Sequence, residues 1–312
     1  MMSRDESVPW DDLAWVEDDT GWAAGCRWLQ SWWRHHELQM PPGPRSRKSA
    51  GLVCSMLPLD HRDRNSLDDS IAAAAESRLV EAHGSGIIAK DRLYRNLLSS
   101  QPTCFNLFGR FVSHPEALLG WVLTLDPDAV SIERVRLEWA PNRGTHFDGG
   151  SAFDAFVAYR AERGGQRFVG VECKYAEDLR RSSIDVRKVH KDFTAGSGLW
   201  KDRASERLDT NRLKQFWLNT LLGQSLATRG EYFESGLIVI VAGAADRSAA
   251  MATDQVRAEL VDPDRWLRWY PYEQLLATID GHDEWRSQFQ RRYLDFGPVR
   301  HRLADGDPRL DS

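Results

Sequence analysis

The sequence predicts an α/β fold in which helices flank a mixed central sheet. After Asp126-Pro-Asp128 the pattern of apolar residues changes from helical to alternating, and three strands follow in quick succession. A later run, Leu237-Ile-Val-Ile-Val-Ala-Gly243, is continuously apolar, as a strand buried on both faces would be. The predicted order of elements is therefore helix, three strands, helix, strand.

The first predicted elements are helices that precede the sheet. Residues 67–81 have a helical pattern with acids in the first turn, which favours a helix start there. Further helix is expected around residues 91–98 and over residues 115–125, where Pro115 suits the first helical position.

The strands are expected at about residues 131–139, 153–160 and 167–175, and Gly164-Gly165 is typical of a hairpin turn between the last two. A polar stretch, residues 176–206, follows them and is long for a structureless loop, so we expect a mobile lid or small inserted elements. A helix is then predicted over about residues 207–228.

Residues 1–48 are predicted to be an acidic, tryptophan-rich segment and linker, and residues 49–312 the main domain. The first twenty residues hold seven acids and one base, a local charge of −6, whereas the whole chain has a formal net charge of −5. Six tryptophans lie between residues 10 and 33. We interpret them as packing or partner-binding residues, for a homodimer or another protein, rather than as base-stacking ones.

Several classes of protein are excluded by composition and motifs. The four cysteines lie far apart without a CxxC pair, and no apolar run is long enough for a membrane span or a signal peptide. We therefore expect a soluble, cytoplasmic protein without a membrane partner. The histidines form no pair typical of zinc sites, and the glycine-rich dipeptides lack the lysine of phosphate-binding loops.

One acid-x-lysine tripeptide, Glu172-Cys-Lys174, lies in the third predicted strand, although about one such tripeptide is expected by chance in this composition. Its context makes it informative. Side chains alternate between the faces of a strand, so Glu172 and Lys174 share the face opposite Val171. In the preceding strand Asp154 lies on one face with Phe156, and a hairpin partner can set Asp154 beside Glu172.

Two carboxylates on adjacent strands repel each other unless a positive charge lies between them. A hard divalent cation with open water positions is the usual solution, so we expect Mg²⁺, or Mn²⁺ in its place. Such an ion polarises a phosphoryl oxygen, while a nearby lysine orients water or offsets charge on the phosphorus. The combination suits phosphodiester hydrolysis.

On these residues the sequence resembles the PD-(D/E)XK, restriction-endonuclease-like nuclease superfamily. That superfamily shares a core of helix, three antiparallel strands, helix and strand, which the element order matches over about residues 110–245, here with extra N-terminal helices. The resemblance implies that Asp154 and Glu172 are the metal-binding acids, with Lys174 as the catalytic lysine. It also implies that the backbone carbonyl of Cys173 joins the metal ligands. Phe153 stands where the motif has proline.

The resemblance implies further site residues. Some families of the superfamily, including the RecB-like group, place a glutamine on the helix after the motif strand, and Gln215 takes that position here. The tyrosine usual four residues later is Asn219. Many families also use an acid from the first core helix, and whether Glu116 or Glu81 fills that role stays open.

A basic stretch follows the motif. The stretch from Asp178 to Lys214 contains ten lysines and arginines and six acids, which gives a local charge of +4. A solvated surface and contact with phosphate both fit this composition, and the position directly after the motif favours phosphate. The substrate is expected to be nucleic acid, with DNA favoured over RNA, and the candidate contacts are Arg180, Arg181, Lys188 and Arg212.

Three other interpretations accompany this one. The trio of Asp154, Glu172 and Lys174 could be a surface salt-bridge cluster, which is common and contributes little. The fold could also be a catalytically inactive nucleic-acid-binding or scaffolding module, although an inactive site has no physical reason to keep all three residues. Finally, the acidic N-terminal segment could regulate the site by mimicking nucleic acid over the basic stretch.

Overall fold

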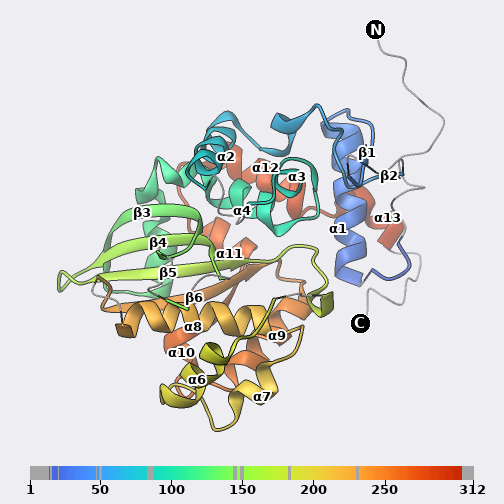
Figure 1. Ribbon diagram of the computed structural model, residues 1–312. Helices are drawn as coiled ribbons and strands as arrows, with labels where there is room; N and C mark the ends of the chain where they lie inside the picture. The colour runs from blue at the N-terminus through green and yellow to red at the C-terminus, as the bar shows by residue number, and fades with distance from the viewer. Residues whose placement is uncertain are drawn as a thin grey trace.

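A five-stranded mixed sheet lies between two layers of helices (Figure 1). The computed structural model describes residues 14, 16–19, 21–46, 48, 51–82, 88–142, 146–147, 151–181, 184–229 and 232–303. The strands are β3 (Ala129–Trp139), β4 (Phe153–Ala161), β5 (Gln166–Cys173), β6 (Ser235–Ala242) and β7 (Leu267–Pro271), side by side in that order.

The directions of these strands confirm the predicted fold class. The pairs β3–β4 and β4–β5 are antiparallel, whereas β5–β6 and β6–β7 are parallel. The three antiparallel strands and the later apolar strand were predicted, and each boundary agrees within about two residues. The fifth strand, β7, was not predicted.

Most of the helices before the sheet form the layer above it in Figure 1, and the first one, α1, stands at the right. The predicted helix at 115–125 begins as a 3-10 turn and continues as an α-helix. The segments up to the sheet are α1 (Gly21–Trp32), η1 (Trp33–Glu37), β1 (Gly43–Pro44), β2 (Leu52–Val53), η2 (Arg62–Asn65), α2 (Asp69–Glu81), α3 (Lys90–Arg95), α4 (Ser100–Phe108), η3 (Gly109–Val112), η4 (Pro115–Leu118) and α5 (Leu119–Leu125).

The elements after β5 supply the lower layer and return to the upper one at the end of the chain (Figure 1). Helices α6 to α10 lie below the sheet, and α11 and α12 lie above it. These elements are η5 (Leu179–Arg181), α6 (Lys188–Gly196), α7 (Ala204–Leu208), α8 (Lys214–Arg229), α9 (Arg247–Arg257), α10 (Pro263–Trp266), α11 (Tyr272–Ala277), α12 (Asp283–Tyr293), η6 (Gly297–Val299) and α13 (Arg300–Leu303).

Both faces of the central strands β4, β5 and β6 are buried, which explains why these strands are so apolar. Ala155, Val171 and Val239 belong to the core between the sheet and the upper helices. Phe156 and Ile238 belong to a second core, between the sheet and α8. The alternation within β4 and β5 therefore separates two apolar layers rather than an apolar face from a solvated one.

Helix α8 lies unusually close to the sheet. A Cβ atom added to Gly223 would stand 2.4 Å from the Cδ1 atom of Ile238, so any larger residue there would require the Ile238 side chain to move. The hairpin between β4 and β5 also depends on glycine, because Gly164 has a φ of 84°. Together these two positions set the register of β5 and the distance at which α8 crosses it.

The polar stretch after β5 contains inserted elements, one of the two alternatives expected there. It holds η5, α6 and most of α7. The single helix predicted over 207–228 is wrong at its start, since α7 ends at Leu208 and α8 begins at Lys214. Turn hydrogen bonds, from Leu213 N–H to Thr210 O among others, occupy the break.

The N-terminal segment packs against the rest of the chain where it is described. The Nε1 atom of Trp22 donates to the carbonyl of Tyr175 at 2.5 Å, and Trp28 and Trp33 are buried. Trp10 and Trp15 lie outside the described residues. The division of the chain at residue 48 stays a prediction. None of the described helices is both long enough and apolar enough to cross a membrane.

Candidate active site

The antiparallel pairing of β4 and β5 brings the start of one strand to the end of the other. Ala155 pairs with Val171, so Asp154, just before Ala155, and Glu172, just after Val171, lie at the same end of the neighbouring strands. The backbone N–H of Cys173 donates to Oδ2 of Asp154 at 2.8 Å. The first acid is thus tied directly to the strand that carries the second.

Lys174 and Glu172 form a buried ion pair. The Nζ atom of Lys174 donates to Oε1 of Glu172 at 2.5 Å, and the two residues are only 4% and 1% exposed. The backbone of Lys174 is held as well, because its N–H donates to the carbonyl of Val241 at 2.8 Å and its carbonyl accepts from the Tyr272 hydroxyl at 2.6 Å. A surface salt-bridge cluster would not be enclosed in this way.

Helix α8 supplies two amide side chains to the same pair. The Nζ atom of Lys174 also donates to Oε1 of Gln215 at 3.0 Å, and Nε2 of Gln215 donates to Oε1 of Glu172. One helical turn later, Nδ2 of Asn219 donates to Oε2 of Glu172. The structure therefore brings Gln215 to the motif residues. It also brings Asn219, which sequence analysis noted only as a replacement for tyrosine.

A third carboxylate, that of Glu138, lies beside the two predicted ones. Leu137 pairs with Ala155 and Trp139 with Phe153, which sets Glu138 opposite Asp154 across β3 and β4. Glu138 is 5% exposed. Glu138 was not among the predicted site residues, although the strand predicted at 131–139 includes it, because the pairing of β3 with β4 is not visible in the sequence.

The backbone at Glu138 is left-handed, with a φ of 46°, which is uncommon for a residue other than glycine. Arg78 from α2 holds it by donating from Nε to the carbonyl of Leu137 and from Nη2 to that of Glu138, each at 2.7 Å. From α4, Nε2 of Gln101 donates to Oε1 of Glu138 at 2.7 Å. The carboxylate is thus oriented by two helices outside the sheet.

Burial and mutual repulsion dominate the electrostatics of the site. Burial raises the pKa of Asp154 well above its usual range, and the charges of Glu172 and Glu138 raise it further. Burial raises the pKa of Glu138 to about 7. Burial also raises the pKa of Glu172, against the effect of Lys174. For Lys174, burial alone would lower the pKa, but Glu172, Glu177 and Asp154 raise it, so the amine stays protonated.

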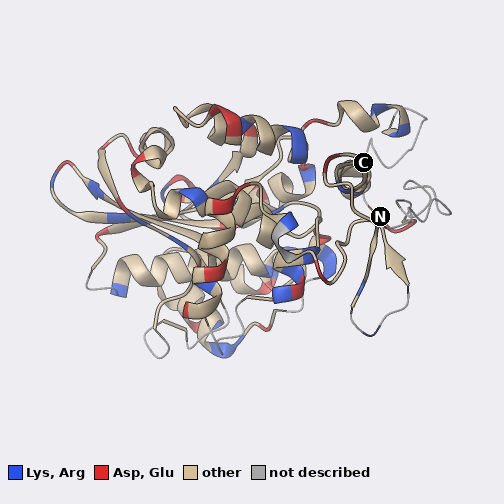
Figure 2. Ribbon diagram, turned by 90° about the horizontal axis from the view of Figure 1, so that it is seen from above, with Lys and Arg blue, Asp and Glu red and all other residues tan. Residues whose placement is uncertain are grey.

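Three of the predicted nucleic-acid contacts form ion pairs with acids close by in the sequence. Arg180 pairs with Asp178 at 2.8 Å, Arg181 with Asp178 at 3.3 Å, and Lys188 with Asp192 at 2.7 Å. Figure 2 shows the same interspersion of basic and acidic positions over much of the chain.

Arg212 lies in the break between α7 and α8, and its Nε is buried without a hydrogen-bond partner among the described residues. The two acids considered for the first core helix are exposed. Glu116 lies 3.7 Å from Nδ1 of His114, and Glu81 lies 3.4 Å from Arg78.

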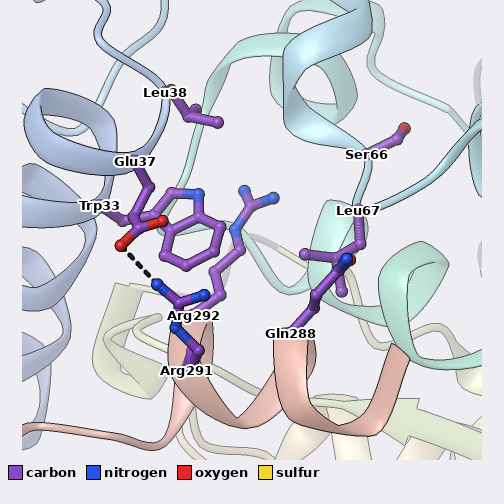
Figure 3. A pocket seen from close by; sticks show the side chains of 8 residues that line it. All are labelled: Trp33, Glu37, Leu38, Ser66, Leu67, Gln288, Arg291 and Arg292. Atoms are coloured by element: carbon purple, nitrogen blue, oxygen red, sulfur yellow. Dashed lines mark hydrogen bonds and ion pairs between the residues drawn. The ribbon is translucent and has the colours of Figure 1, made fainter. Parts of the chain in front are cut away.

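Two cavities of the described part are not lined by the motif residues. One of about 220 Å³ lies between η1 and α12, where Glu37 and Arg291 form an ion pair at its rim (Figure 3). Another, of about 460 Å³, lies between the N-terminal ends of α2 and α12. Neither cavity is lined by both a carboxylate pair and a lysine. The candidate active site is therefore the group of residues at the ends of β4 and β5.

Hard oxygen atoms at the strand ends fit a divalent cation. The described residues contain no group of three or more His, Cys, Asp and Glu side chains placed to hold a metal ion, whereas the expected set has two carboxylates and the Cys173 carbonyl. The buried carboxylates of Glu172 and Glu138 and the half-buried one of Asp154 lie beside one buried amine, and a divalent cation would offset their mutual repulsion. Oxygen ligands favour Mg²⁺ or Mn²⁺ over softer metals.

Comparison with protein families identifies a family for most of the chain. The model of a family described as the PD-(D/E)XK nuclease superfamily matches residues 17–295. No curated protein and no solved structure matches the chain.

Proposed function

The chain belongs to the PD-(D/E)XK nuclease superfamily, and from this premise we propose that it is a metal-dependent nuclease that hydrolyses phosphodiester bonds of nucleic acid. The observation that carries the proposal is the buried pair of Glu172 and Lys174 beside Asp154. A carboxylate pair and a protonated amine at one strand end are the groups that phosphodiester hydrolysis requires.

The cation would be held by Asp154, Glu172 and the backbone carbonyl of Cys173. Mg²⁺ or Mn²⁺ bound there would polarise a phosphoryl oxygen and lower the pKa of water. The hydrogen bond from the Cys173 N–H to Asp154 supports this set, because it fixes the first acid relative to the carbonyl that follows.

The amine of Lys174 would offset the negative charge that develops on the phosphoryl oxygens and would orient the attacking water. Its raised pKa keeps it cationic. Gln215 and Asn219 would act as positioning residues, since they hold Glu172 by both of its oxygens. Removing either amide would loosen the pair without removing a charge.

A cleavage assay tests this proposal. Plasmid and oligonucleotide substrates are incubated with Mg²⁺ or Mn²⁺ and the wild-type chain, Asp154→Ala or Lys174→Ala. The matched control is Glu162→Gln, an exposed acid in the hairpin at the far end of β4 and β5. We expect both site variants to lose cleavage by at least about a hundredfold while the control keeps it. Equal rates in all four proteins would sink the assignment.

For substrate binding we propose phosphate contacts by Arg180, Arg181, Lys188 and Arg212, with DNA favoured over RNA. The position of η5 directly after the motif strand supports this. Each lost phosphate contact should reduce the slope of log affinity against log salt by about 0.9 for duplex DNA. Arg181→Gln should show this reduction, and Arg163→Gln, in the far hairpin, should not; equal slopes would count against the contact.

A non-catalytic nucleic-acid-binding module is the rival function, and binding without cleavage under every cation tested would favour it. Regulation by the acidic N-terminal segment is a separate proposal, supported by Asp18, which lies 3.6 Å from Arg181. Deleting residues 1–40 would also remove α1, so Asp18→Asn is the cleaner variant. It should bind nucleic acid more tightly than wild type, and unchanged affinity would argue against this regulation. A homodimer or protein partner through residues 1–48 stays a prediction.

A further inference from the structure

Glu138 and Gln101 make an acceptor pair beside the acids of the motif. Gln101 is 5% exposed, and its Nε2 donates to Oε1 of Glu138. Its Oε1, on the same planar amide, is buried and has no hydrogen-bond partner in the part of the chain that the structure describes. The unpartnered oxygen therefore lies next to the Glu138 carboxylate.

Burial is unfavourable for both the Gln101 carbonyl oxygen and the Glu138 carboxylate. A buried carbonyl without a donor loses the hydrogen bonds that water would give it, and a buried carboxylate loses its hydration. Burial raises the pKa of Glu138 most, and the charge of Glu172 raises it further, against the charges of Arg78 and Arg92. The Gln101 oxygen in particular lacks a hydrogen-bond donor among the described residues.

The local fold holds the pair in this position. The left-handed backbone at Glu138 is clamped through two carbonyls by the Arg78 guanidinium. Such a conformation costs free energy and persists only where the surroundings determine it, often at functional sites. The cross-strand position places the side chain opposite Asp154.

Water molecules around a hydrated cation would supply the missing donors. Mg²⁺ keeps several of its waters when one or two carboxylates bind it, and each such water has protons to donate. Direct ligation by three acids does not match the described arrangement, in which no three acidic side chains are grouped as metal ligands. An arrangement in which Glu138 and Gln101 accept hydrogen bonds from water bound to the cation does match it.

We propose that Glu138 and Gln101 are outer acceptors of the cation site, which receive hydrogen bonds from the waters of an ion held by Asp154 and Glu172. This inference rests on the proposed function. Both are positioning residues: they act on the ion through its waters and fix the orientation of the waters that remain.

The test measures cation binding rather than cleavage. Mn²⁺ is titrated calorimetrically into the full chain and into Glu138→Gln, an isostere that still accepts from Gln101. Its control is Glu133→Gln, because Glu133 is an exposed glutamate on the same strand that pairs with Arg160. We expect Glu138→Gln to weaken Mn²⁺ binding by about ten- to a hundredfold with unchanged stoichiometry, and the control to match wild type.

Gln101→Met is the second variant, since it removes the unpartnered acceptor without changing charge. It should weaken Mn²⁺ binding by about tenfold. Wild-type affinity in both Glu138→Gln and Gln101→Met would overturn the inference. Complete loss of binding in Glu138→Gln, or a lower stoichiometry, would also overturn it by making Glu138 a direct ligand.

Asp154→Asn separates this inference from the function on which it rests. It should abolish Mn²⁺ binding. If it does and Glu138→Gln binds like wild type, the outer role fails and the nuclease proposal stands. If Asp154→Asn binds Mn²⁺ like wild type, the proposed metal site itself fails.

Discussion

Replacing Lys174 by methionine should destabilise the metal-free protein strongly, because it removes the buried cation and leaves the carboxylates. Methionine keeps most of the side-chain volume, so the loss is mainly electrostatic. The Nζ atom stands 2.5 Å from Oε1 of Glu172, and both groups are buried. Two unit charges 4 Å apart interact by about 4 kcal/mol at an effective dielectric constant of 20.

Measurements on other buried pairs give a similar magnitude. Removing one partner of a buried ion pair costs about 3–5 kcal/mol. We therefore expect Lys174→Met to lower the free energy of unfolding by about 3 kcal/mol at pH 8 in the absence of divalent cations. At pH 5 the loss should be smaller, because the raised pKa of Glu172 allows it to become neutral by taking up a proton.

Urea unfolding followed by circular dichroism measures this, with Glu172→Gln and the double variant completing a cycle. The double variant should recover most of the loss in Lys174→Met, since no unpaired charge then remains at that position. Lys188→Met is the control, because the Lys188 side chain is 88% exposed and its pair with Asp192 should contribute little. A loss in Lys174→Met no larger than in Lys188→Met would refute the reasoning.

Three further predictions concern stability. Burial raises the pKa of Glu138 to about 7, above about 4.3 for an unperturbed glutamate. The contribution of Glu138 to the free energy of unfolding is therefore present below about pH 4 and is lost as the pH rises through 7. Urea titrations of the metal-free wild type at pH 4.5 and 7.5 should show this loss, about 3 kcal/mol, and Glu138→Gln should lack it. Gly223→Ala should cost about 1–3 kcal/mol, because its Cβ would meet Ile238 at 2.4 Å; an unchanged midpoint of thermal unfolding would contradict the close packing of α8. Trp22→Phe should cost about 1 kcal/mol through the lost hydrogen bond to Tyr175, and chemical denaturation would detect it.

The arrangement of the motif residues on the strands could be predicted because strand geometry is periodic. Alternation alone puts Glu172 and Lys174 on one face, and a hairpin sets Asp154 beside them. Gln215 followed from resemblance and from its place on the helix predicted after the motif strand. The site roles of these residues stay predictions until cleavage and cation binding are measured.

Glu138 escaped prediction because its position depends on distant residues. The ladder between β3 and β4 shifts register twice, between Ala129 and Ser131 and between Ile132 and Arg134, so face alternation cannot be counted along β3. The left-handed backbone at Glu138 is held by Arg78, 60 residues earlier in the chain. No local pattern carries that information.

Strand β7 escaped prediction for a similar reason. It is a five-residue strand that ends in Pro271 and pairs only with β6, through a parallel ladder whose partners lie far apart in sequence. A short apolar segment that ends in proline is, by its sequence alone, typical of a loop or an edge strand.

The hydrogen bond from the Tyr272 hydroxyl to the carbonyl of Lys174 has a consequence for the order of synthesis. It joins residues 98 positions apart. A growing chain therefore carries the complete acid-x-lysine tripeptide long before it carries the hydroxyl that anchors the end of that strand. A fragment truncated after β6 would contain every motif residue and still lack this anchor. Adding the missing C-terminal piece as a separate peptide is then a way to assemble the site at a chosen time.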